Sequence, residues 1–246
     1  MKYSKNYGWV PDIPDQRDYL YSAIKPVIRL PGKVDLRENC SVIENQLKLG
    51  SCTAQALAGN LEFLDKKIDG EYADVSRLFI YYNERAIMDT IDYDSGASLR
   101  VGIKTLKNDG VCHEETWPYV ISRFDKKPSK ECYDEAKKHL IESYHRLCAI
   151  PEMLTCLAEG YPFVFGFAVY ESFESKEVAR TGIVYMPKKD ETQVGGHAVM
   201  AAGYDQEAKR FLVRNSWGDK WGMAGYFTMP FEYVSTMAND FWTIRR

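Results

Sequence analysis

The amino-acid sequence predicts an α+β protein built from two unlike lobes. From about residue 46 to residue 145, apolar side chains recur at the spacing of amphipathic helices. From about residue 146 to residue 246, short runs of aromatic and β-branched residues alternate with turn residues, which is typical of strands. Two lobes that pack against each other form a cleft, and such clefts are common ligand sites.

Residues 1–33 have a composition that fits neither lobe. Aromatic residues alternate there with prolines, namely Tyr3, Tyr7, Trp9, Tyr19 and Tyr21 with Pro11, Pro14, Pro26 and Pro31. Prolines at this density disfavour a long helix or a central strand. A solvated linker carries few aromatic rings, so we expect an extended strap or short pro-segment that lies on the domain formed by residues 34–246.

The helical lobe begins with one clear amphipathic pattern. Apolar residues from Leu57 to Ile68 fall on one face of a helix, and Gly70 supplies its end. Ser76 is placed to cap a second helix through Arg85. Two further helices are expected at about residues 98–107 and 129–142.

The second lobe opens with a short helix at about residues 151–159. Strands are expected after it, because each following apolar run is bounded by glycine, proline or charged turns. These runs are Phe163–Tyr170, Gly182–Met186, His197–Tyr204, Arg210–Asn215 and Tyr226–Met229.

The composition argues against several classes of protein. The chain has 246 residues, of which 45% are hydrophobic and 27% charged, and its net charge is −3. Proteins that hold nucleic acid usually carry a basic surface, so no nucleic-acid partner is expected. No run approaches the roughly 18–20 apolar residues that span a bilayer, so no membrane partner is expected either. Met1–Tyr7 is not followed by the apolar core of a signal peptide, which favours the cytoplasm unless a leader has been removed.

The six cysteines do not form a recognisable metal site. They are Cys40, Cys52, Cys112, Cys132, Cys148 and Cys156. No C-x-x-C pair occurs among them and no pair of histidines at zinc-ligand spacing accompanies them, so no metal is expected. If one is a nucleophile, five remain, which cannot all pair within the chain. One or two disulfides stay open, although Cys156 has apolar neighbours and is expected to be a buried thiol.

Cys52 is the first candidate for a catalytic residue. It stands at the start of the first amphipathic helix, where unpaired N–H groups and the helix dipole favour a thiolate. The alternative is a residue at a helix start with no chemical role. A nucleophile also needs a base, and His197 differs from the other three histidines. It follows Gly195 and Gly196, which allow close backbone approach, and it precedes an apolar strand.

Asn215 is the candidate that orients this histidine. Its amide oxygen can accept a hydrogen bond from one imidazole nitrogen and so fix the tautomer. Trp217 is close enough in sequence to shield that hydrogen bond from water. His197 follows Cys52 by 145 residues, and Asn215 follows His197 by 18. The alternative is a turn asparagine beside core tryptophans.

Four segments together resemble the papain family of cysteine peptidases. They are Gln46–Ala54, Gly195–Tyr204, Asn215–Tyr226, and Gly110-Val111 with Trp117-Pro118-Tyr119. In this family the histidine and asparagine lie about 130–150 residues after the cysteine. The resemblance implies a papain-like two-lobe fold, with a helical left lobe, a β-barrel-like right lobe and the active site in the cleft between them.

The resemblance also implies roles for further residues. Gln46 corresponds to the glutamine whose amide lines the oxyanion hole, beside the backbone N–H of Cys52. Gly96 and Ala97 lie in a segment similar to the one on which the substrate backbone pairs. Substrate contacts are further implied for Leu99, Gly196, Ala198 and Trp217, with Leu99 and Ala198 in an apolar pocket. The implied activity is hydrolysis of peptides or proteins through a covalent acyl-enzyme, by a monomer that needs no cofactor and no metal.

The sequence departs from the family in several places. Thr53 stands where most members have tryptophan, which predicts altered packing around intact chemistry. Leu49, Asp94 and Glu191 stand where disulfide cysteines are usual, which indicates a reducing compartment or a disulfide-poor prokaryotic-type branch. Only the strap precedes residue 34, in place of a helical prodomain of about a hundred residues.

The strap suggests a hypothesis about control, and two other functions stay open. We expect the strap to pack along the lobes and partly cover the cleft through Tyr7, Trp9, Asp15 and Tyr19. One other function is a catalytically inactive homologue that acts as a binding or regulatory protein. The second, an amidase or transglutaminase, is less favoured because those families place cysteine and histidine closer together and lack the Asn-Ser-Trp-Gly segment.

Overall fold

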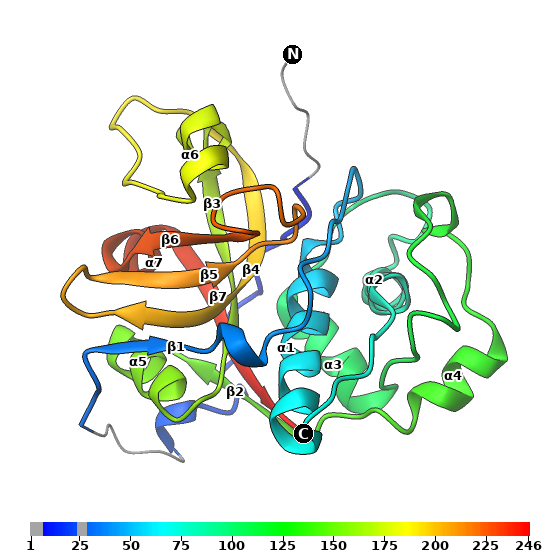
Figure 1. The fold of residues 1–246 in the computed structure, drawn as a ribbon. Coiled ribbons are helices and arrows are strands. Elements are labelled where there is room, and N and C mark those ends of the chain that lie inside the picture. The colour runs from blue at the N-terminus through cyan, green and yellow to red at the C-terminus, as the bar shows by residue number, and fades with distance from the viewer. Residues whose placement is uncertain (1–6, 24–28) are drawn as a thin grey trace.

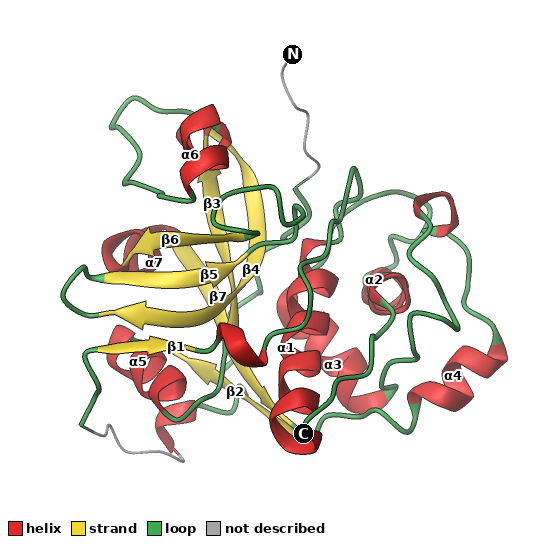
Figure 2. Cartoon of the chain, in the orientation of Figure 1, coloured by secondary structure: helices red, strands yellow, loops and turns green. Residues whose placement is uncertain are grey.

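The computed structural model describes residues 7–23 and 29–246, and it has two halves that meet along one helix (Figure 1). One half is helical and the other is a twisted antiparallel sheet with short helices around it (Figure 2). This arrangement confirms the predicted α+β class and the two-lobe organisation. The strap prediction for residues 1–6, including Tyr3, and for residues 24–28, including Pro26, falls outside the described residues.

The helical half contains α1 (Cys52–Asp69), α2 (Arg77–Ile87), α3 (Leu99–Asn108) and α4 (Lys130–Ala136). Gly70 ends α1 in the left-handed conformation that glycine adopts without strain, and the Ser76 hydroxyl accepts the Phe79 N–H at the start of α2. The first three helices therefore agree with the sequence. The fourth is shorter than expected, because Ile141 turns into the core and its N–H bonds to Leu106.

The sheet is formed by β1 (Lys33–Asp35), β2 (Ser143–Leu147), β3 (Phe163–Tyr170), β4 (Gln193–Asp205), β5 (Arg210–Arg214), β6 (Tyr226–Pro230) and β7 (Ala238–Arg245). The order is β2-β7-β3-β4-β5-β6, with β1 also paired to β4, and every pair is antiparallel. No pairing joins β2 to β6 within the described part of the chain, so the sheet is open at these edges.

One predicted strand was wrong and three were missed, namely β1, β2 and β7; β1 has only three residues. Residues 182–186 form no strand; Gly182 ends a helix with φ +65°, and only Ile183 makes an isolated bridge, to Thr228. The strands β2 and β7 were not predicted, because charged residues such as Arg146 and Asp240 interrupt their apolar pattern. The short helices of this half are α5 (Ile150–Ala158), α6 (Lys176–Thr181) and α7 (Phe231–Met237). Across the described chain, 3₁₀ turns lie at Tyr21–Ala23, Arg37–Asn39, Ile121–Arg123 and Glu171–Glu174.

The side chains of β3 divide the apolar interior into two cores. Phe163, Phe165 and Phe167 point into a core inside the β half. Val164 points the other way, into the core shared with the helices, as the two-residue period of a strand requires. The start of α1 packs against β4, so this shared core places one end of a buried helix beside the middle of the longest strand.

Candidate active site

Cys52 is the first residue of α1 and is completely buried. The loop before it is fixed by Tyr119, whose hydroxyl lies 2.6 Å from Ser51 Oγ and donates to the Gln46 carbonyl at 3.0 Å. The backbone N–H of Ala198, the residue after His197, hydrogen-bonds the Cys52 sulfur. The helix start and the histidine strand therefore meet at the sulfur.

His197 lies on β4, opposite Phe167 of β3, and is also fully buried. Its Nε2 is 2.9 Å from Asn215 Oδ1, and Asn215 follows directly after β5. Trp217 stacks on the imidazole, with ring centroids 4.9 Å apart and planes 23° from parallel. The indole ring therefore covers one face of the imidazole, and its shielding of the His197–Asn215 hydrogen bond stays a prediction.

Gln46 lies between the loop before Cys52 and the segment after Asn215. Its Nε2 donates to the Leu49 carbonyl at 3.0 Å, and its Oε1 accepts from Ser216 Oγ at 2.7 Å. Its backbone N–H bonds to the Ser216 carbonyl as well. The four residues predicted as catalytic are thus brought to one place, and Gln46 links the loop before Cys52 to the segment after Asn215.

The electrostatics of Cys52 in this structure oppose the expectation from its position in the sequence. Burial raises the pKa of the Cys52 thiol to about 12, and the backbone N–H groups of Ala198 and Gly8 lower it only in part. The helix start was expected to favour the thiolate. Desolvation outweighs that effect here, because a segment of the chain covers the sulfur.

The covering segment is the strap, which lies between the two halves (Figure 1). The Ala97 N–H donates to the Gly8 carbonyl at 2.7 Å, and the Val10 N–H donates to the Ala97 carbonyl at 2.8 Å. On the other wall, the Trp9 N–H donates to the Gly196 carbonyl at 3.2 Å. Strap residues 8–10 therefore pair with two of the positions predicted to bind a substrate, Ala97 and Gly196.

Glycines on both sides of the cleft make room for the strap. A Cβ on Gly8 would lie 1.6 Å from the Gly50 carbonyl oxygen, and a Cβ on Gly96 would lie 2.1 Å from the Gly8 oxygen. A Cβ on Gly195 would meet the Tyr7 ring at 2.5 Å. The glycine pair before His197 was expected to admit a ligand, and the group it admits here is a segment of the same chain.

The Trp9 side chain fills a pocket that the sequence did not identify. Its ring lies against Gly166 and Gly196, where added Cβ atoms would approach to 1.9 and 2.7 Å. Its Nε1 donates to Asp240 Oδ2 at 3.1 Å. Leu99 and Ala198, expected to line an apolar pocket, are both buried, and their contact with a substrate stays a prediction. Asp240 was missed because it lies in the C-terminal region, where the family pattern gave no guidance.

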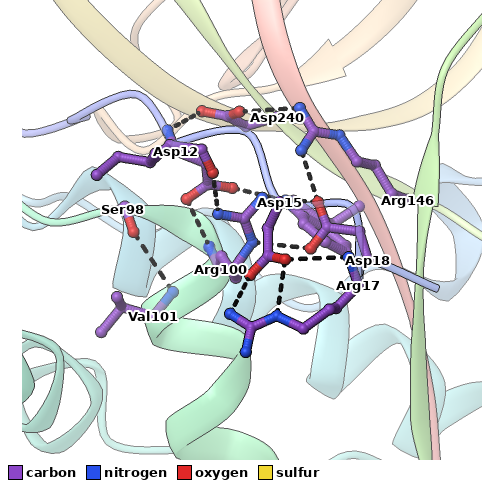
Figure 3. A network of polar contacts seen from close by, with 11 residues as sticks. Asp12, Asp15, Arg17, Asp18, Ser98, Arg100, Val101, Arg146 and Asp240 are labelled. Atoms are coloured by element: carbon purple, nitrogen blue, oxygen red, sulfur yellow. Dashed lines mark hydrogen bonds and ion pairs between the residues drawn. The ribbon is translucent and has the colours of Figure 1, made fainter. Parts of the chain in front are cut away.

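Beyond Trp9, a network of charged residues holds the strap (Figure 3). Asp12 N donates to Asp240 Oδ2 at 2.8 Å, and Trp242 Nε1 donates to Asp12 Oδ2 at 2.9 Å. Asp18 accepts from Arg100 on α3 and from Arg146 on β2, at 2.6 and 2.7 Å. The strap is therefore attached to both halves at once.

The four strap residues named in the hypothesis behave differently. Tyr7 and Trp9 lie in the cleft, where the Tyr7 ring contacts His197 and Trp217 edge-on or tilted. Asp15 forms a local ion pair with Arg17, and Tyr19 is 66% exposed. Of the four, Tyr7 and Trp9 therefore lie in the cleft, and the strap residue that hydrogen-bonds the Cys52 sulfur is Gly8, which lies between them.

Asp94 ties the nucleophile loop to the segment that pairs with the strap. Both of its carboxylate oxygens lie 3.0 Å from Gly50 N, and the Tyr81 hydroxyl donates to it. Tyr81 in turn accepts the Gly96 N–H at 3.0 Å. These hydrogen bonds occur where the papain resemblance would place a disulfide. The structure records all six cysteines as free thiols.

Within 7–23 and 29–246, histidine, cysteine and acidic side chains form no cluster suited to a metal ion. Over the same residues, no helix is long and apolar enough to cross a membrane.

Comparison with known proteins gives one consistent result. The sequence model of the papain family of cysteine proteases matches residues 30–240. A peptidase C1-like protein of Acanthamoeba polyphaga mimivirus is 42% identical, with 98% of this chain and 87% of the viral protein aligned. Xylellain, a cysteine protease from Xylella fastidiosa, has a crystal structure that matches with a TM-score of 0.90 at 42% identity, covering 98% of this chain and 96% of xylellain. The procathepsin L2 proteinase of Tenebrio molitor larval midgut shares the fold, with a TM-score of 0.76 at 21% identity over 98% of this chain and 78% of the other.

Proposed function

Because the chain belongs to the papain family of cysteine proteases, we propose that it is an endopeptidase in which Cys52 is the nucleophile and His197 the general base. Asn215 orients the histidine, and Gln46 supplies one donor of the oxyanion hole. The observation that carries this proposal is the 2.9 Å His197–Asn215 hydrogen bond beside a cysteine at a helix start. Because Nε2 is engaged by Asn215, proton exchange with the thiol goes through Nδ1.

The reaction is acyl transfer in two steps. The Cys52 thiolate attacks the amide carbonyl, and the oxyanion accepts hydrogen bonds from Gln46 Nε2 and the Cys52 N–H. The C–N bond then breaks as the protonated His197 gives its proton to the leaving amine. Neutral His197 next takes a proton from water, the hydroxide attacks the thioester, and the acid product leaves with the thiol restored. Loss of one oxyanion donor costs about 3–4 kcal/mol in related hydrolases.

We further propose that the strap closes the cleft in the resting enzyme. Residues 8–10 use the backbone positions that a substrate needs, and the buried Cys52 is held as a neutral thiol. A peptide must therefore displace the strap before it is cut. The full chain is expected to hydrolyse peptides slowly until the strap moves.

A thiol-directed epoxide, with the modified residue read by mass spectrometry, tests the catalytic assignment. The expected result is labelling of Cys52 that is lost in His197→Ala, together with hydrolysis of fluorogenic peptides that is lost in Cys52→Ser. Equal labelling of all six cysteines would contradict it. Peptide binding without turnover, in a variant with the strap removed, would instead support the inactive homologue.

A further inference from the structure

A buried glutamate, Glu84, lies directly behind the nucleophile Cys52. Glu84 is on α2, is completely buried, and accepts a hydrogen bond from Thr53 Oγ1 at 2.8 Å. Thr53 is the residue after Cys52, so this carboxyl group contacts the first turn of α1. The sequence predicted altered packing at Thr53, because most of the family has tryptophan there. In the structure, the Glu84 carboxyl group packs against this residue.

Among the described residues, Glu84 forms no ion pair that would compensate a negative charge on its carboxyl group. Its Oε1 has no hydrogen-bond partner among the described residues, and none of the ion pairs found within them includes it. The neighbouring Arg85 directs its guanidinium to the carbonyls of Ile91 and Phe124 instead. On the facing helix α3, Gly102 leaves only enough room for the carboxyl, since a Cβ there would lie 2.2 Å from Oε1.

Glu62 is a second buried acid, and unlike Glu84 it has an ion-pair partner among the described residues. It lies on α1 and is also completely buried, but it is paired with Arg77 at 2.8 Å and accepts from Ser41 and Val75 N. Burying a carboxylate without such partners is costly, and the usual outcome is a neutral acid. Burial accordingly raises the pKa of Glu84 to about 8, while Thr53 and Arg85 lower it only in part.

The carboxyl is also close enough to influence the sulfur. Negative charge on Glu84 raises the pKa of Cys52, and the charged group that acts on Glu84 itself is Arg85. We propose that Glu84 is a positioning residue for the nucleophile: uncharged, it holds Thr53 and the first turn of α1, and once ionised it places a negative charge behind Cys52 that disfavours the thiolate. This inference rests on the proposed role of Cys52.

The test is the pH dependence of Cys52 alkylation by iodoacetamide in the full chain, with the labelled residue identified by mass spectrometry. Glu84→Gln keeps the size of the side chain and an oxygen that accepts from Thr53, but it cannot ionise. The informative quantity is the ratio of the variant rate to the wild-type rate at each pH, because the covering strap affects both proteins alike. We expect this ratio to rise on the order of tenfold, equal to one pKa unit, as the pH passes through about 8.

A purely structural role predicts a ratio that does not change with pH, and a constant or falling ratio overturns the proposal. Glu62→Gln is the matched control, with lower thermal stability and a flat ratio expected. If Glu84→Gln does not fold, Thr53→Val is the second test, because it removes the hydrogen bond that lowers the pKa of Glu84. A pH–rate profile of alkylation whose inflection moves to higher pH supports the proposal. An inflection that stays at the wild-type pH overturns it. Alkylation needs no turnover, so a Glu84-dependent ratio in a protein without peptidase activity would count against the proposed function alone.

Discussion

Trp217 and His197 form a stacked pair, with ring centroids 4.9 Å apart, and His197 Nε2 lies 2.9 Å from Asn215 Oδ1. The imidazole is completely buried, and Asn215 is nearly so. A hydrogen bond kept from water is stronger than the same bond in solvent, so the indole ring adds to the orientation of the base.

Replacing Trp217 with alanine should therefore weaken catalysis without removing any reacting group. Exposing one hydrogen bond of this kind costs about 1–3 kcal/mol, which corresponds to roughly tenfold to hundredfold in kcat/KM. Steady-state kinetics with a fluorogenic peptide measures this change. Trp117→Phe, in the helical half, is the control and should leave kcat/KM near the wild-type value. If kcat/KM of Trp217→Ala were unchanged, Asn215 alone would orient the imidazole.

Replacing Trp9 with alanine should open the cleft. The change removes the ring from Gly166 and Gly196 and removes the hydrogen bond to Asp240. Truncating a large aromatic contact costs about 3 kcal/mol, so the strap should detach on the order of a hundredfold more often. Faster alkylation of Cys52 and faster peptide hydrolysis are the expected results. Ile13→Ala changes a strap residue that is 82% exposed and should alter neither rate.

Closure of the strap should depend on pH through Asp240. Burial first and the nearby Asp12 second raise the pKa of Asp240 to about 6, while the Asp12 N–H, Arg146 and Trp9 lower it only in part. A carboxyl group with a raised pKa in the closed state binds its proton more tightly there than in the open state. The resulting stability is present at acid pH and is lost as the pH rises through about 6. Raising the pH should therefore favour opening.

Hydrogen exchange of the Trp9 and Val10 amides, corrected for intrinsic rates, reports this opening directly. Protection should fall between acid and neutral pH in the wild type. Asp240→Asn keeps an acceptor for Trp9 and Asp12 but cannot ionise, so its protection should be independent of pH. If protection of the wild type instead increased with pH, ionisation of Asp240 would not favour opening of the strap.

Asp94 should matter for both stability and turnover. Asp94→Ala leaves the Gly50 N–H and the Tyr81 hydroxyl without their acceptor, at a cost of about 1–3 kcal/mol. Thermal unfolding should move to lower temperature, and kcat should fall because the loop before Cys52 loses its anchor. Asp92→Ala, at an exposed neighbouring position, is the control. Lower stability with unchanged kcat would mean that Asp94 supports the fold alone.

The parts of the site that follow local patterns could be predicted from the sequence. Cys52 precedes an amphipathic face, His197 follows two glycines before an apolar strand, and Asn215 ends a strand beside a tryptophan. Each signal lies within a few residues, and the structure brings these residues together. Their roles in catalysis stay predictions until the kinetics are measured.

The parts that depend on distant partners could not be predicted. Glu84 is one of several charged residues on its helix, and only the packing of α3 through Gly102 shows that its carboxyl is buried. Asp12 and Asp240 are 228 residues apart, and neither has a sequence pattern that points to the other. Strand β7 was missed for the same reason. Asp240 interrupts the apolar pattern of this strand, and its hydrogen bonds to Trp9 and Asp12, distant in sequence, make its burial possible.

The close approach of Gly8 to Gly50 has a consequence for how such an enzyme evolves. Any side chain at position 8 would collide with the Gly50 carbonyl. A single nucleotide change at this codon can therefore abolish restraint and leave the chemistry intact. If the strap closes the cleft as proposed, closure depends on a residue that has no side chain, whereas the proposed chemistry depends on side chains elsewhere in the chain.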